Sequence, residues 1–105
     1  MTHQEVIVLL TEMDIPFAYD HFVEGESPEP PFLVFLYPGS NHFAADGRVY
    51  FKVNRLNIEL YTDKKNVELE ETVEAVLDRH GIFYGKSEVW IESENLYEVL
   101  YQMEV

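Results

Sequence analysis

The sequence predicts an α+β fold in which a mostly antiparallel sheet carries two helices packed on one face. Two segments show the apolar spacing of helices and five show strand-like runs, in the order α-β-β-β-α-β-β. This mixture lacks a repeating strand–helix–strand unit and therefore excludes a parallel βαβ architecture. With 105 residues, 47% of them hydrophobic, the chain has the length and apolar content for one domain spanning residues 1–105.

The first helix is expected from His3 to Met13. Thr2 and Glu5 have the S/T-x-x-E spacing of a capping box, which satisfies the free amide groups at a helix start. Pro16 ends the pattern, because the residue before a proline is pushed out of the helical region. The apolar face of this helix consists of Val6, Leu9, Leu10 and Met13.

Two short strands are expected next, at residues 17–23 and 32–37. The segment 24–31, EGESPEPP, lies between them and is too rich in glycine and proline for regular structure. The second strand is a continuous apolar run, which is typical of a strand covered on both faces. A loop follows from Pro38 and ends at Asp46-Gly47, a dipeptide that favours a turn before a strand.

The longest strand is expected from Arg48 to Thr62, but its alternation changes phase. Val49, Phe51 and Val53 share one parity, whereas Leu56, Ile58 and Leu60 share the other. A regular strand that faces one core cannot change phase in this way. Either a bulge lies at Asn54-Arg55, or the two halves bury opposite faces. The second alternative suits a strand that leaves its own core to meet a neighbouring subunit.

The second helix is expected to begin at the cap residue Asn66, with Glu68, Glu70 and Glu71 in its first turns. Gly81 suits its C-terminal end. Its apolar face consists of Leu69, Val73, Val76 and Leu77. The final two strands are expected at residues 82–92 and 96–105, where Tyr97, Val99, Tyr101, Met103 and Val105 alternate with mostly polar residues.

The search for catalytic and ligand-binding patterns gives no candidate, so we expect no enzyme, no cofactor and no metal site. Cysteine is absent, which excludes disulfides and thiolate chemistry. The four histidines, His3, His21, His42 and His80, lie on separate elements without metal-ligand spacing. No serine lies in a G-x-S-x-G context, and no glycine-rich phosphate loop occurs. No apolar run approaches the roughly 18 residues of a membrane span, so we expect no membrane partner.

The charge distribution is more informative than the net charge of −13. Residues 1–47 carry −8, residues 48–65 carry +3, and residues 66–105 carry −8. The acidic total argues against specific nucleic-acid binding, which needs clustered Lys and Arg. The basic segment has two interpretations: a central strand that pairs with acidic neighbours in its own sheet, or a surface that docks onto copies of itself or onto a partner.

The candidate interface residues come from this basic segment and from the aromatic residues. Tyr and Trp are enriched at protein interfaces, and fifteen aromatic residues are more than a core of this size obviously requires. If Val89 and Ile91 face inward on their strand, Trp90 faces outward. The predicted interface residues are Arg48, Lys52, Arg55, Trp90, His42 and Phe43.

Two stretches, NRLNIELYTDK at residues 54–64 and IESENLYEV at residues 91–99, resemble small proteins of tailed bacteriophages and of prophages in Gram-positive bacteria. These proteins are similar to the head–tail joining and tail-completion (tail terminator) group of long-tailed phages. The resemblance implies an α+β subunit that assembles into a six-fold ring between the capsid connector and the tail tube. It implies no catalytic residues.

The resulting functional hypothesis is a non-enzymatic virion structural protein that acts in tail completion or head–tail joining. Its expected partners are further copies of itself, in a homo-oligomeric ring, and the tail-tube and connector proteins. It would act in the bacterial cytoplasm during assembly and then in the virion. The alternative is an acidic protein-binding module, such as a DNA mimic that inhibits a nucleic-acid-binding protein, because −13 is a large charge for 105 residues.

Overall fold

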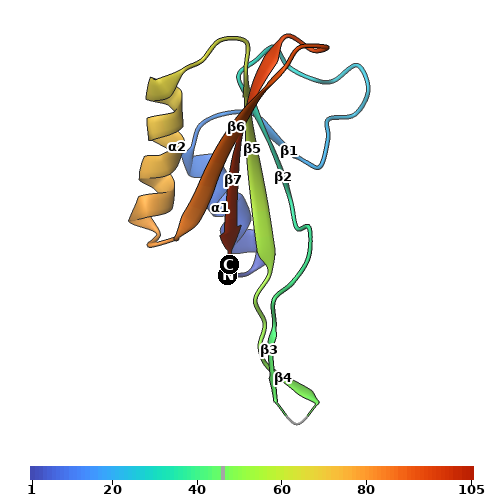
Figure 1. Ribbon diagram of the computed structural model, residues 1–105, viewed down its shortest axis with the longest axis vertical. Helices are drawn as coiled ribbons and strands as arrows, with labels where there is room; N and C mark the ends of the chain where they lie inside the picture. Colours follow the sequence, from blue (N-terminus) through green and yellow to red (C-terminus); the bar gives the residue numbers. More distant parts are fainter. Residues whose placement is uncertain (46) are drawn as a thin grey trace.

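A five-stranded sheet forms the centre of the protein, with strand order β1-β2-β5-β7-β6 (Figure 1). The computed structural model describes residues 1–45 and 47–105, and in the stretches 43–45 and 49–51 it describes the backbone alone. The strands of the sheet are β1 (Phe17–Tyr19), β2 (Phe32–Leu36), β5 (Arg55–Thr62), β6 (Tyr84–Ile91) and β7 (Leu96–Glu104). Only β1 and β2 pair in parallel; the other neighbours are antiparallel.

Two helices complete the main body, and their ends follow from the sequence. In α1 (His3–Glu12) the capping box is formed: Glu5 N–H donates to Thr2 Oγ1 at 3.1 Å, and Thr2 N–H donates to a Glu5 carboxylate oxygen at 3.0 Å. In α2 (Val67–Arg79) the Asn66 side chain accepts from Leu69 N–H at 3.0 Å. Gly81 follows with a φ of +66°, the left-handed conformation that glycine adopts without strain.

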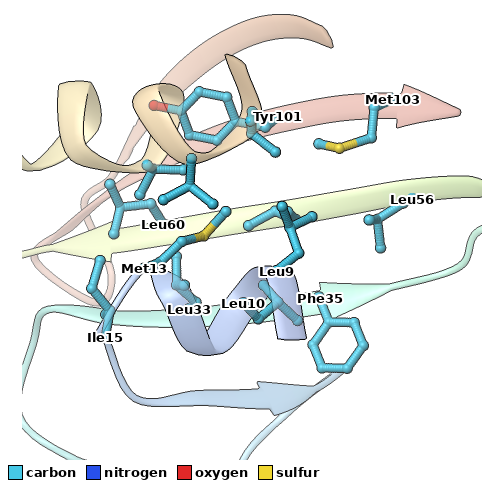
Figure 2. Packing of buried hydrophobic residues seen from close by; sticks show 14 of the residues in the cluster. Leu9, Leu10, Met13, Ile15, Leu33, Phe35, Leu56, Leu60, Tyr101 and Met103 are labelled. Atoms are coloured by element: carbon cyan, nitrogen blue, oxygen red, sulfur yellow. The ribbon is translucent and has the colours of Figure 1, made fainter. Parts of the chain in front are cut away.

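Both helices pack on the same face of the sheet, so the predicted α+β fold class is confirmed. The order of the main body, α1-β1-β2-β5-α2-β6-β7, is the predicted α-β-β-β-α-β-β. Figure 2 shows the shared core, with α1 side chains lying against β2 and β5. The core comprises Val6, Leu9, Leu10, Met13, Ile15, Leu33, Phe35, Leu56, Ile58, Leu60, Val73, Val76, Leu77, Val99, Tyr101 and Met103.

The sequence-based boundaries need three corrections. The first strand ends at Tyr19 instead of Val23, because Asp20 has a φ of +63°, which is incompatible with a continuing strand. The segment expected as a loop after Pro38 contains a strand, β3 (Phe43–Ala45), which pairs with β4 (Arg48–Phe51). The expected single strand from Arg48 to Thr62 is two strands in two sheets.

The phase change at Asn54-Arg55 therefore coincides with a boundary between sheets. β4 ends at Phe51, and β5 begins at Arg55 in the main sheet, where its apolar residues are buried as predicted. The Val49 and Phe51 side chains lie outside the described part. The burial of the first half of the strand expected from Arg48 to Thr62 therefore stays a prediction. Of the expected turn, Asp46 also lies outside the described residues, whereas Gly47 has a φ of +73°. No helix in the described residues is long and apolar enough to cross a membrane.

Candidate interaction surface

The β3–β4 hairpin, residues 41–53, extends away from the rest of the protein along its longest dimension, which is 49 Å (Figure 1). Its two strands pair with each other in a separate two-stranded sheet. An isolated two-stranded hairpin is marginally stable in water, because it has no core on which to bury its side chains. The described part of the hairpin thus stands apart from the main sheet.

The stem of the hairpin is anchored to the last strand of the main sheet. Asn54 and Val105 exchange backbone hydrogen bonds in both directions, at 3.1 and 2.8 Å. The Asn41 side chain donates to a Glu104 carboxylate oxygen at 2.9 Å. His42 Nδ1 accepts from the backbone N–H of Val53 at 2.8 Å, which links the two sides of the stem. The direction of the hairpin is thus set by the body at its base.

Four of the six predicted interface residues lie on or at this hairpin. His42, Arg48 and Lys52 are exposed along it, and Phe43 begins β3, although the Phe43 side chain is outside the described part. Residues 41–53 carry two cations and one acid, a net charge of +1, so the remaining residues together carry −14. The projecting segment is therefore the basic part of an acidic protein.

Arg55 occupies a different environment at the base of the hairpin. It is exposed at the start of β5, and its partner in the β5–β7 register is Glu104. A shallow groove lies beside it, between Pro38, Phe83 and Glu104. Arg55 thus faces an acid of its own sheet, as the intramolecular interpretation of the basic segment expects, whereas Arg48 and Lys52 lie beyond the sheet.

Trp90 lies far from the hairpin, near the other end of β6. It pairs in register with Tyr97, and the two ring centroids are 4.8 Å apart. Lys86 contacts α2, so its side chain lies on the face of the sheet that carries the helices. Trp90 is four residues further along the strand and therefore lies on the same face. Trp90 is nevertheless 42% exposed, and together with Tyr97 and residues 63–65 it lines a shallow pocket. The condition that Val89 faces inward, on which an outward Trp90 depended, is not met: Val89 lies on the face without helices and is 52% exposed.

The end of the molecule opposite the hairpin is acidic. The loop that follows β1 and the β6–β7 turn lie there (Figure 1), and they approach each other around a shallow pocket. Their exposed carboxylates are Asp20, Glu24, Glu26, Glu29, Glu92 and Glu94, and no Lys or Arg interrupts residues 20–31. We call these six residues the acidic end. The subunit therefore has a basic projection at one end and carboxylates at the other.

The helix-free face of the sheet carries Glu59, a partly buried carboxyl group with a shifted pKa. Burial raises the pKa of Glu59, and the nearby charge of Glu98 raises it further. Tyr61 donates a hydrogen bond to Glu59 at 3.2 Å, which opposes this shift. Across residues 1–45 and 47–105, no three His, Cys, Asp or Glu side chains are grouped as metal ligands would be.

Two features of this surface were not predicted from the sequence. Phe83, just before β6, is 92% exposed, although it is an aromatic residue between Ile82 and Tyr84, both of which are partly buried. The run Ile82-Phe83-Tyr84 gives no signal for which ring faces the core, because it lies between a helix end and a strand start. β6 is also an edge strand, and edge position depends on strand order, which a single sequence does not specify.

The comparisons with known proteins do not extend these observations. The chain matches no protein-family model, and no curated protein is significantly similar to it.

Proposed function

We propose that this chain is a non-enzymatic virion assembly protein of a tailed bacteriophage or prophage, a tail-completion or head–tail joining subunit. It would act through ring-type self-assembly and docking onto tail-tube and connector proteins. The resemblance of residues 54–64 and 91–99 to such proteins supports the class. These segments form β5 with its following turn, and the end of β6 with the start of β7.

The observation that carries the proposal is the basic hairpin that projects from an otherwise acidic body. Subunits of a ring contact each other head to tail, so each needs two different surfaces that complement one another. Arg48 and Lys52 on the hairpin supply one sign of charge, and the body supplies the other. Opposite potentials on two surfaces favour oriented association and oppose random contacts.

The proposed setting is the bacterial cytoplasm during assembly and then the finished virion. A ring around the path of DNA must let the nucleic acid pass without retaining it. A surface dominated by carboxylates repels phosphates and is suited to this role, because retention would need clustered Lys and Arg. The net charge of −13 supports this interpretation.

The proposal is tested by mass photometry of the purified chain, alone and mixed with tail-tube and connector proteins from the same phage or prophage genome. We expect a ring, or a complex with at least one of these two proteins. A chain that stays monomeric up to high concentration and binds neither protein would overturn the proposal. A monomer in isolation that joins a tail or connector assembly would still support it.

A shortened variant provides the matched control. Ser40 and Asn54 are bridge partners at the stem, so residues 41–53 can be replaced by the two-residue turn Asn-Gly. The body should remain folded, with a thermal midpoint within about 5 °C of the parent protein, because none of the hairpin side chains that the structure describes belongs to the core. Its association with itself or with the tail proteins should weaken at least about tenfold.

No observation favours the DNA-mimic alternative over this proposal. Mimicry needs carboxylates in spaced rows on one surface. Exposed carboxylates of the described residues lie on the outer side of α2, at the acidic end and on the helix-free face of the sheet, with Lys and Arg between them.

A further inference from the structure

Strand β6 is a free edge of the main sheet. It pairs with β7 on one side only, over eight residues without a shift in register. A long edge strand presents unpaired N–H and C=O groups, and natural proteins usually protect such an edge with a proline, a bulge, a charged side chain or a covering segment. β6 contains no proline, and its single lysine, Lys86, is paired with Glu70 and Glu74 of α2. Its backbone is therefore available to another strand.

The same edge is bordered by exposed apolar side chains. Phe83 is 92% exposed, Val89 is 52% exposed and Trp90 is 42% exposed. No other stretch of this length among the described residues exposes three large hydrophobic side chains. Apolar residues on both faces of an edge are typical of a strand that receives a partner.

Carboxylates of α2 flank the edge. Lys86 of β6 contacts Glu70 at 2.9 Å and Glu74 at 2.8 Å, so this side of α2 faces β6. Asp78 lies one turn after Glu74 on the same side of the helix, and the charges of both raise the pKa of Tyr84, after the effect of burial. Glu88 adds a half-exposed carboxylate on β6 itself, which is paired with Lys65 at 2.8 Å, whereas Asp78 is exposed. An added strand would therefore meet negative charge on its helix side.

We propose that this edge is the receiving surface for the hairpin of a second copy of the chain, with β4 adding to β6 as a sixth strand. The inference rests on the proposed self-assembly and names its interface. β4 has a free edge too, because it pairs with β3 alone. In an antiparallel register with Arg48 opposite Glu88, Lys52, which directly follows the end of β4, comes opposite Tyr84 and near Asp78.

The edge of β6 could pair with β4 or with β6 of a second copy, and the charges near the edge favour β4. A β6–β6 pairing about a two-fold axis would bring the α2 helices of both subunits together, with Asp78 and Glu71 of each on neighbouring exposed surfaces. Like charges placed together across an interface oppose association. The hairpin instead brings Arg48 and Lys52 to these carboxylates. It also gives a head-to-tail contact, which can propagate around a ring.

Cysteine cross-linking tests the pairing of β4 with β6. The chain has no native cysteine, so every disulfide must form between the introduced residues. Arg48→Cys protein is mixed, at high concentration and under mild oxidation, with single variants along the edge: Gly85→Cys, Ser87→Cys, Glu88→Cys and Val89→Cys. Gly85 tolerates a side chain, because an added Cβ would meet only a backbone oxygen at 4.0 Å. Ser27→Cys, in the loop after β1, is the control partner. We expect the Glu88→Cys mixture to form the mixed disulfide about tenfold faster than the control.

If the mixed disulfide forms fastest at another edge position, the result supports the pairing with a different register. Equal rates for all edge positions and the control overturn it. Rapid self-linking of Ser87→Cys alone, without mixed products, assigns the edge to β6–β6 pairing and also overturns it.

Charge exchange gives an independent check on assembly. Arg48→Glu with Lys52→Glu should weaken self-association about tenfold, as should Glu88→Lys with Asp78→Lys. Combining the four changes should restore it, because the charges are exchanged across the interface. If the wild-type chain joins tail-tube or connector protein but all variants assemble equally, the proposed function stands and this interface is wrong.

Discussion

The ammonium group of Lys86 lies 2.9 Å from a carboxylate oxygen of Glu70, a side chain that is only 3% exposed. Lys65 approaches the other oxygen of the same carboxylate at 2.8 Å. A buried charge is tolerated when it is fully paired and hydrogen-bonded. Glu70 thus joins the loop before α2, α2 itself and the edge strand β6, and it fixes the surface along which we place the neighbour's hairpin.

Glu70→Gln should lower the free energy of unfolding at pH 7 by about 1–3 kcal/mol. The change removes the charge that both lysines hydrogen-bond, and the two lysines are each more than a third exposed, which limits the loss through solvent screening. Urea denaturation measures it. Glu71→Gln, on the exposed side of the same helix, is the control and should change stability by less than about 0.5 kcal/mol. Equal losses in the two variants would contradict the assigned role of Glu70.

The same pair of variants should respond to pH. Burial raises the pKa of Glu70, but the hydrogen bonds from Lys65 and Lys86 outweigh burial, so the pKa lies below its ordinary value of 4.5. A lowered folded-state pKa gives stability that is present above 4.5 and is lost as the pH falls through the folded value. The difference between wild type and Glu70→Gln should therefore shrink in acid.

Glu59→Gln should change the free energy of unfolding in the opposite direction to Glu70→Gln. The pKa of Glu59 is raised by burial and by the charge of Glu98, so its ionised form destabilises the native state. Such a group contributes stability below its unfolded-state pKa, and that contribution is lost as the pH rises through the folded value. Glu59→Gln should stabilise the protein at pH 7 by up to about 1 kcal/mol and have no effect near pH 3. Glu24→Gln, at an exposed carboxylate of the acidic end, serves as the control. If Glu59→Gln instead destabilises the protein at neutral pH, the hydrogen bond that Tyr61 donates to Glu59 outweighs the cost of burying the charge.

Leu9→Ala and Phe83→Ala separate folding from association. Leu9 is fully buried, so its truncation leaves a cavity and should cost about 2–5 kcal/mol of unfolding free energy. Phe83 is 92% exposed, so Phe83→Ala should change the stability of the monomer by less than about 0.5 kcal/mol. It should nevertheless weaken self-association, because Phe83 borders the receiving edge. Thermal denaturation and sedimentation of both variants make the comparison; a large loss of monomer stability in Phe83→Ala would place this ring inside the fold.

The sequence predicted those parts of the fold that local chemistry determines. The Thr2–Glu5 capping box and the Asn66 cap are formed, because each needs only residues a few positions apart. The alternation in β5 and β7 also predicted the core face correctly, since every second residue must meet the helices. The fold class follows from these elements.

Features that depend on distant partners were missed. Phe43 to Ala45 form a strand only because β4 returns beside them, and a three-residue run carries no periodicity of its own. The side of Trp90 could be given only conditionally, because the strand 84–91 alternates without a clear apolar face and its register with β7 determines the orientation. For the interaction surface, the basic segment was evident in the sequence, whereas its projection and the free edge of β6 required strand order.

The stem of the hairpin has a mechanical consequence. The hairpin continues directly into β5, which lies between β2 and β7 and is hydrogen-bonded to both. Tension applied along the hairpin therefore loads two backbone ladders in shear, so many hydrogen bonds must rupture together before the strand slides. A molecule that binds this projection and pulls on it would therefore load the central strand along its own length, where the hydrogen bonds to β2 and β7 share the force.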